Sequence, residues 1–186
     1  MEIALERIRN WVPGTRLDLF YLQLTSLPVL PNTLTILTCS CNSLTSLPTL
    51  PDTLTELHCC ENELTSLPTL PDTLKVLNCS ENKLTLLPTL PDTLECLNCW
   101  NNQLTSLPSL PVTLTWLSSY GNKIPTRMFG EGIPDFSKRI CVWEAEESRM
   151  RIQTATGQIK EELMMNRWSP ARIDAQLALG LNLEDM

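Results

Sequence analysis

Four cysteines recur at intervals of 20 residues, and they are the side chains best suited to chemistry: Cys39, Cys59, Cys79 and Cys99. A thiolate is a nucleophile and a zinc ligand. Stacked copies of one unit would place these thiols in a straight row, about 4.8 Å apart. Zinc needs tetrahedral convergence, and the Cβ atoms of a disulfide lie about 3.8 Å apart. Because cysteine also packs as a small apolar side chain, the row predicts buried, reduced thiols, and no metal ion or cofactor is expected.

His58 is the only histidine in the chain, and Glu56, Cys60 and Cys96 are expected on the same face. A metal site would require these side chains to converge across about 10 Å of sheet. A cysteine–histidine pair would also need an oxyanion site, which no motif signals. A glycine-rich phosphate loop is absent from the sequence as well. We therefore predict no catalytic residues and no enzyme activity.

The spacing of these residues comes from a 20-residue repeat, L-x-x-L-x-C-x-x-N-x-L-x-x-L-P-x-L-P, whose copies begin at Leu34, Leu54, Leu74, Leu94 and Leu114. A degenerate copy precedes them. Alternating apolar residues in the first half predict a strand, and stacked copies predict a parallel sheet. Prolines three residues apart in the second half, such as Pro48 and Pro51, exclude a helix and favour an extended, polyproline-like back.

An asparagine column accompanies the leucines: Asn42, Asn62, Asn82, Asn102 and Asn122. Each amide is expected to bind backbone groups at the turn after its strand, in its own unit and in the neighbouring one. The column is predicted to be structural.

This unit resembles the short, Leu-Pro-rich leucine-rich repeat of the bacterial type over about residues 15–125. The resemblance implies a curved solenoid whose concave strand face binds partners. The family includes secreted effectors of animal pathogens, and similar arrays occur in proteins of large DNA viruses of amoebae. A shorter resemblance, in Trp168 to Arg172 and the terminal Leu-Glu-Asp, is to tails of marseillevirus-type proteins.

Three regions are expected: a capping helix within 1–14, a leucine-rich-repeat array of about six turns over 15–125, and a non-repeating cap over 126–186. Over 2–11, apolar residues fall mostly on one helical side. They are Ile3, Leu5, Ile8 and Trp11. Gly130, Gly132 and Pro134 predict a loop, 138–152 fits strand or helix, and helices are favoured over 158–168 and about 170–179.

The net charge of the 186-residue chain is −7, and no basic run occurs. This argues against nucleic acid and anionic membranes as partners. No uncharged stretch approaches the roughly 20 apolar residues of a membrane helix, and the N-terminus does not resemble a signal peptide. We therefore expect a reducing cytoplasm or host-cell cytosol, and a virion location also fits the viral resemblance.

The outward strand positions are the ones that the repeat leaves free to vary, and several of them hold aromatic residues, which are typical of binding hot spots. We predict a protein partner bound at Phe20, Tyr21, Ile36, Glu56, His58, Val76, Asn78, Cys96, Asn98, Trp100, Trp116 and Tyr120. A host-directed effector and a self-assembling virion component, with a second copy as partner, are the alternatives. A cysteine-dependent ubiquitin ligase is disfavoured, because Cys141 lacks that family's motif.

Overall fold

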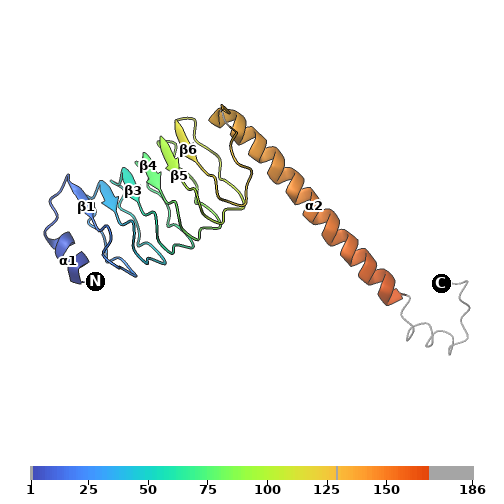
Figure 1. Ribbon diagram of the computed structural model, residues 1–186, viewed down its shortest axis with the longest axis horizontal. Coiled ribbons are helices and arrows are strands. Elements are labelled where there is room, and N and C mark those ends of the chain that lie inside the picture. Colours follow the sequence, from blue (N-terminus) through green and yellow to red (C-terminus); the bar gives the residue numbers. More distant parts are fainter. Residues whose placement is uncertain (1, 129, 168–186) are drawn as a thin grey trace, which may run out of the picture. The chain divides into compact units, whose positions relative to one another are not determined.

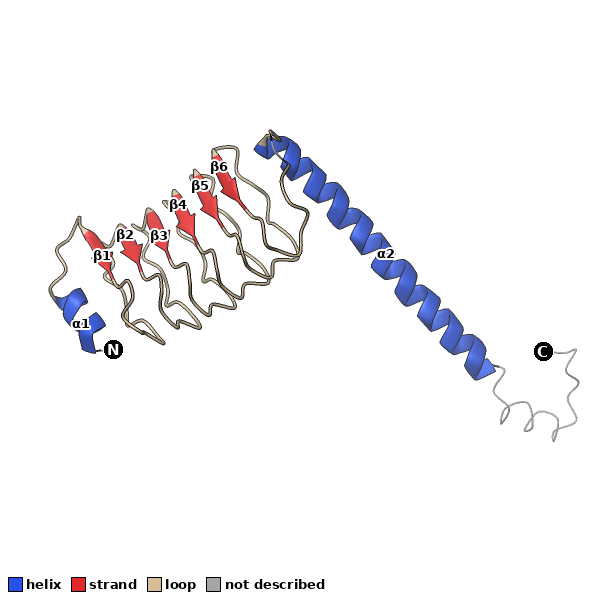
Figure 2. Ribbon diagram, in the orientation of Figure 1, coloured by secondary structure: helices blue, strands red, loops and turns tan. Residues whose placement is uncertain are grey.

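The computed structural model describes residues 2–128 and 130–167, and the chain forms two compact units, Met1–Cys141 and Val142–Met186. The elements follow in the order α1 (Glu2–Arg9), β1 (Arg16–Asp18), β2 (Ile36–Thr38), β3 (Glu56–His58), β4 (Val76–Asn78), β5 (Cys96–Asn98), β6 (Trp116–Ser118) and α2 (Ile133–Arg167) (Figures 1 and 2). All strands lie in the first unit, and α2 begins there and continues into the second.

The six strands form one parallel sheet in chain order, each strand hydrogen-bonded to the next. The register pairs residues that are 20 apart in the sequence, such as Leu57 with Leu77. Each repeat therefore contributes one turn of a solenoid with a strand on one side (Figure 2). This confirms the predicted leucine-rich-repeat fold.

The interior of the solenoid consists of the repeat's apolar columns. In the central turns, leucines at three positions of the unit are fully buried, for example Leu54, Leu57 and Leu64, and so is Cys59. From Thr38 to Trp116, each segment that connects one strand to the next contains neither helix nor strand, as the proline spacing predicts. A turn closed by the Leu54 N–H on the Pro51 carbonyl (3.0 Å) leads from one such segment back into the next strand.

The asparagine column joins each turn to the one before it. The Oδ1 atom of Asn82 accepts a hydrogen bond from Leu64 N–H (3.0 Å) in the preceding turn. Its Nδ2 group lies 3.0 Å from the carbonyl oxygen of Cys59 and 3.1 Å from that of Cys79. Asn42, Asn62, Asn102 and Asn122 repeat these bonds. The predicted structural role of the column is therefore confirmed.

A second ladder, of threonines, was not anticipated from the sequence. The Thr73 hydroxyl lies 2.7 Å from the carbonyl oxygen of Asp52 and 2.8 Å from that of Leu54, both in the preceding turn. The same contacts recur at Thr53, Thr93 and Thr113. Threonine thus connects the turns at the start of each unit as asparagine does after each strand.

The N-terminal helix differs from its predicted form. α1 ends at Arg9, and Trp11 lies beyond it, donating from its indole N–H to the Thr15 carbonyl (2.9 Å). Ala4 is the buried helical residue, whereas Ile3 and Leu5 are about half exposed. A small side chain on the contact stripe lets the helix approach closely, which leaves the larger side chains at the flanks.

The predicted loop at Gly130, Gly132 and Pro134 is partly wrong, because α2 begins at Ile133 and Pro134 lies in its first turn. Proline is tolerated there since the first helical N–H groups have no partner within the helix. The ambiguous 138–152 segment is helical. The predicted helix after Pro170 lies outside the described residues.

The first turns of α2 hold a buried apolar pair and an ion pair. Phe136 and Ile140 are buried. The Arg139 guanidinium donates to both carboxylate oxygens of Glu131 (2.8 Å each) and to the Thr126 carbonyl (2.9 Å). These bonds from Arg139, together with one from the Met128 N–H, lower the pKa of Glu131 to about 2. They fasten the segment before α2 to the helix.

Replacement of Asn82 by alanine should lower the free energy of unfolding by about 2 kcal/mol. It leaves the buried Leu64 N–H without its partner and removes one of the two asparagine donors from each of the Cys59 and Cys79 carbonyls. Urea unfolding measures the loss. The control is Asn32→Ala, at an exposed position where another copy has Val112, and it should change stability by less than about 0.5 kcal/mol. Equal effects of the two changes would contradict the ladder's role.

The Glu131–Arg139 pair predicts a specific acid sensitivity. The folded-state pKa of Glu131 is depressed to about 2 from the ordinary 4.5, so its contribution is complete above pH 4.5 and is lost as the pH falls towards 2. Urea midpoints of the natural chain should fall more steeply over this range than those of Glu131→Gln. Parallel pH profiles for the two proteins would show that the pair contributes nothing.

Candidate functional site

The candidate site is the strand face, defined as the outward side chains of β1 to β6 and of the second residue after each strand. Three residues of each turn lie on it, and the 20-residue register aligns them in columns across the sheet. Side chains between them, such as Leu57 and Cys59, point into the core. The predicted site residues other than Tyr21 belong to this face.

The strand face carries exposed aromatic residues at both ends. Trp116 is 49% exposed and Tyr120 is 52% exposed. The ring of Tyr120 stacks on that of Trp100 with 5.3 Å between centroids and 12° between planes, which leaves Trp100 half-buried. Aromatic pairs with this spacing gain free energy beyond their buried area, so the stack is a preformed element of the face.

At the other end, Phe20 is 49% exposed and Tyr21 is 70% exposed, and their ring centroids lie 6.2 Å apart. Tyr21 adopts a left-handed backbone (φ 52°) at the turn after the strand, so it stands at the edge of the face. It lines a 310 Å³ pocket with Cys41 and Glu61. Four strand spacings of about 4.8 Å separate this aromatic pair from Trp100.

The middle of the face combines polar side chains with two aliphatic ones, Ile36 and Val76. The Nε2 atom of His58 lies 3.4 Å from Glu56 Oε2, and both side chains are partly exposed. Ile36, Val76, Asn78, Cys96 and Asn98 are half-buried. Thr38, Ser40 and Ser80 occupy equivalent outward positions, yet they are buried, because small side chains are covered by larger neighbours. An outward position in the register is thus not always an accessible one.

Two side-chain atoms on this face are buried without a hydrogen-bond partner among the described residues: Thr38 Oγ1 and Asn98 Oδ1. In the preceding turn, Asn78 Oδ1 accepts from the Ser80 hydroxyl (2.8 Å). The residue equivalent to Ser80 in the next turn is Trp100, which has no hydroxyl. The sequence pattern contained this difference, but only the structure shows its consequence for Asn98.

The four column cysteines are buried core residues. Burial raises the pKa of Cys39 and of Cys99 to about 12 and raises the pKa of Cys59 and of Cys79 well above the ordinary value. Burial, followed by the 3.3 Å hydrogen bond to Glu61, also raises the pKa of Cys41 to about 11. These thiols are therefore suited to packing and not to nucleophilic attack at neutral pH.

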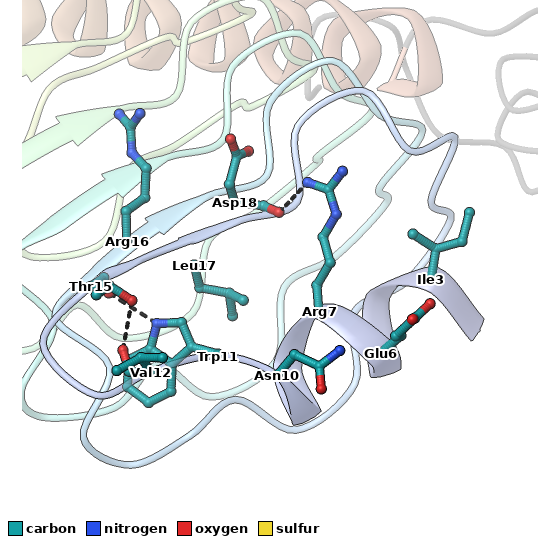
Figure 3. A pocket seen from close by; sticks show the side chains of 10 residues that line it. All are labelled: Ile3, Glu6, Arg7, Asn10, Trp11, Val12, Thr15, Arg16, Leu17 and Asp18. Carbon is teal, nitrogen blue, oxygen red and sulfur yellow. Dashed lines mark hydrogen bonds between the residues drawn. The ribbon is translucent and has the colours of Figure 1, made fainter.

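A pocket of about 490 Å³ lies at the N-terminal end, between α1 and β1 (Figure 3). Arg7 crosses it to donate to the Asp18 carbonyl (2.6 Å), and Trp11 closes its floor by bonding to Thr15. Its two arginines are matched by two acids, Glu6 and Asp18. The only predicted site residue near it is Phe20, whose N–H bonds to the Asp18 carboxylate (2.9 Å). The pocket is the gap beside a short capping helix.

Within 2–128 and 130–167, no three His, Cys, Asp or Glu side chains are grouped so as to hold a metal ion. No helix of the described chain has the length and apolar character to cross a membrane. Cys141 is exposed on α2. The strand face therefore remains the feature with the clearest binding character.

Comparison with solved structures returned leucine-rich-repeat proteins of bacterial pathogens. The chain is similar to YopM from Yersinia enterocolitica WA-314 (37% identity, TM-score 0.59, covering 64% of this chain and 26% of that one). It is also similar to a Shigella effector leucine-rich-repeat domain (41% identity, TM-score 0.62, covering 65% of this chain and 56% of that one). A third match is YopM, a leucine-rich effector protein from Yersinia pestis (39% identity, TM-score 0.61, covering 65% of this chain and 35% of that one). The chain therefore spans less than two thirds of each neighbour.

These matches confirm the resemblance to the bacterial-type repeat. They do not support the marseillevirus resemblance, whose residues lie outside the described part of the chain. A scan of family models and a search of curated proteins returned no match.

Thiol labelling should separate the cysteines by position. Iodoacetamide at pH 8 is expected to alkylate exposed Cys141 in the native protein and to leave Cys39, Cys59, Cys79 and Cys99 unmodified, because burial keeps them protonated and inaccessible. Peptide mass spectrometry measures this, and denatured protein, in which all eight cysteines should react, is the control. Rapid native labelling of Cys59 would contradict the packing role.

Proposed function

Because the chain folds as a bacterial-type leucine-rich-repeat solenoid, we propose that it is a protein-interaction module that binds its partner on the strand face, the concave side expected of such solenoids. The observation that carries the proposal is the exposure of Trp116 and Tyr120 at positions where the repeat imposes no residue type. Exposed aromatics cost solubility and contribute strongly to interfaces.

The size and order of the face support this role. A standard interface buries about 800 Å² on each partner, and a six-stranded sheet about 24 Å across offers a surface of that scale. The ladders of Asn82 and Thr73 fix the backbone beneath it. A preorganised surface loses little conformational entropy on binding.

We further propose that the partner is a protein of a host cell. The neighbours named above are described as effectors, one from Shigella and one from Yersinia pestis. A net charge of −7 accords with a protein partner rather than with nucleic acid or an anionic membrane. A host cytosol would also keep the buried cysteine column reduced.

Strand-to-strand self-assembly is less well supported at the first edge of the sheet. The outward carbonyl of Asp18 is occupied by Arg7, and the next outward N–H, that of Phe20, is bound by the Asp18 carboxylate. A second copy would have to break these bonds before it could pair with β1. The observations therefore favour a different protein as partner.

Replacing Trp100 by alanine should weaken binding to the natural partner by at least 30-fold, as expected for an interface hot spot, without changing the fold seen by circular dichroism. The partner is first captured from host lysate, and its affinity is then measured by calorimetry. The control is Val112→Ala, at a fully exposed position in the turn before β6 and outside the strand face, which should bind normally. Unchanged affinity in a folded Trp100→Ala protein would contradict the proposal.

A further inference from the structure

The C-terminal half of the strand face is uncharged. From Val76 to Tyr120, the outward strand positions carry no Asp, Glu, Lys, Arg or His, whereas Arg16, Asp18, Glu56 and His58 occupy earlier rows. In a chain of net charge −7, this neutrality is a local property of the surface. A highly charged partner segment would find no compensating charge there.

Because large aromatic side chains flank smaller ones in the register here, we infer a trough in this neutral area, defined by Asn98, Trp100, Trp116, Ser118 and Tyr120. Asn98 and Ser118 pair in the register of β5 and β6 and form its floor. The Trp100–Tyr120 stack stands on one side and Trp116 on the other. These walls are four residues apart along an extended chain, so their Cα atoms are about 13 Å apart.

The floor of the trough presents hydrogen-bond donors. Asn98 Oδ1 is buried and without a partner among the described residues, while the side chain as a whole is partly exposed. The NH₂ group is therefore the part of the amide that faces the trough. The indole N–H of Trp116 can donate a hydrogen bond but cannot accept one, and the hydroxyl of Ser118 can also donate. A complementary ligand must supply acceptors, and the absence of cationic side chains favours neutral carbonyls over carboxylates.

We propose that the trough binds a proline-rich segment of a partner protein in the polyproline II conformation; this inference rests on the function proposed above. Such a segment has no internal hydrogen bonds and presents its carbonyls to its surroundings, and proline has no N–H that would be left unpaired. Aromatic-lined grooves are a recurring way to hold it.

The spacing of the sheet fits this ligand. One polyproline turn of three residues rises about 9.3 Å, close to the roughly 9.6 Å of two strand spacings. Carbonyls one turn apart can therefore face the rows of Asn78 and Ser118, and the NH₂ group of Asn98, which lies between these rows, can donate to one of these carbonyls. Added strand pairing is excluded here, because this face presents side chains and no backbone groups.

A carbohydrate is the competing neutral ligand. Sugars bind aromatic residues chiefly through an open ring face, whereas Trp100 and Tyr120 each direct one face at the other with only 12° between their planes. The two walls, the Trp100–Tyr120 stack and Trp116, therefore favour a narrow ligand inserted between the walls over a flat sugar ring laid on top of one ring. The geometry therefore favours the peptide.

The test uses the full chain and a capped, uncharged ten-residue polyproline peptide, with affinity measured by calorimetry and by tryptophan fluorescence. A capped Gly/Ser peptide of equal length should bind at least 10-fold more weakly. Trp116→Ala should weaken polyproline binding at least 10-fold, and Asn98→Leu about five-fold, through loss of one hydrogen bond. Thr38→Val, which removes the other unpartnered polar atom of this face, is the matched control and should stay within about two-fold.

Several results would overturn the assignment: no binding of polyproline, equal binding of the Gly/Ser peptide, binding of cellohexaose in its place, or full polyproline affinity in a folded Trp116→Ala. The captured partner separates the two levels of proposal. If its affinity still falls in Trp100→Ala while polyproline does not bind, only the proline-rich assignment fails. If Trp100→Ala leaves the partner's affinity unchanged, the strand-face function fails as well.

Discussion

The structure depends on satisfying the backbone of a coil that contains little regular secondary structure. Each 20-residue turn has only a three-residue strand, so most of its N–H and C=O groups need partners from elsewhere. The amide of Asn82 supplies a donor group and an acceptor at once, and it reaches both its own turn and the previous one. Leucine packing alone would tolerate a shift between turns, whereas these directional bonds do not. The asparagine ladder therefore sets the register that aligns the strand face.

The repeat made the fold predictable because apolar residues occupy the same core positions in five copies of the unit. Leu57 or Cys59 alone would be weak evidence, but the same types at every twentieth position identify the buried columns. The N-terminal and C-terminal segments have no repeated copies, so each of their residues is the only evidence for its own position. Pro134 suited a loop by type, although the first turn of a helix also accepts it. Ala4 was overlooked because close approach of a helix depends on a small side chain, which hydrophobic patterning does not detect. The threonine ladder is not apparent from the sequence, because Thr73 is an exposed polar residue of a type common in turns.

For the candidate site, the sequence indicates which side chains point outward from the sheet, but not which of them are exposed to solvent. The 20-residue spacing correctly assigned Ser80, Trp100 and Tyr120 to one column, yet Ser80 is buried while Tyr120 is half exposed. Exposure depends on the size of the neighbours, which differs from turn to turn. The stacking of Trp100 on Tyr120 follows from their register, since side chains directly opposite on adjacent strands are in contact range. The spacing alone implies that pairing, whereas only the structure shows that the amide oxygen of Asn98 is buried without a partner among the described residues.

The turn after each strand imposes a different kind of constraint, on the backbone alone. The residue before each ladder asparagine is left-handed, with φ between 52° and 57° at Cys41, Glu61, Glu81 and Asn101 and 71° at Gly121. Tyr21, at the equivalent position of the first turn, also has a positive φ (52°), although Leu22 follows it in place of an asparagine. Non-glycine residues pay a conformational cost there, and the adjoining asparagine bonds hold them in place. Because the core makes no demand on these side chains, the edge can carry charge, as Glu61 and Glu81 do. Two of the chain's 21 acidic residues thus lie along the turn edge, outside the neutral aromatic end of the strand face.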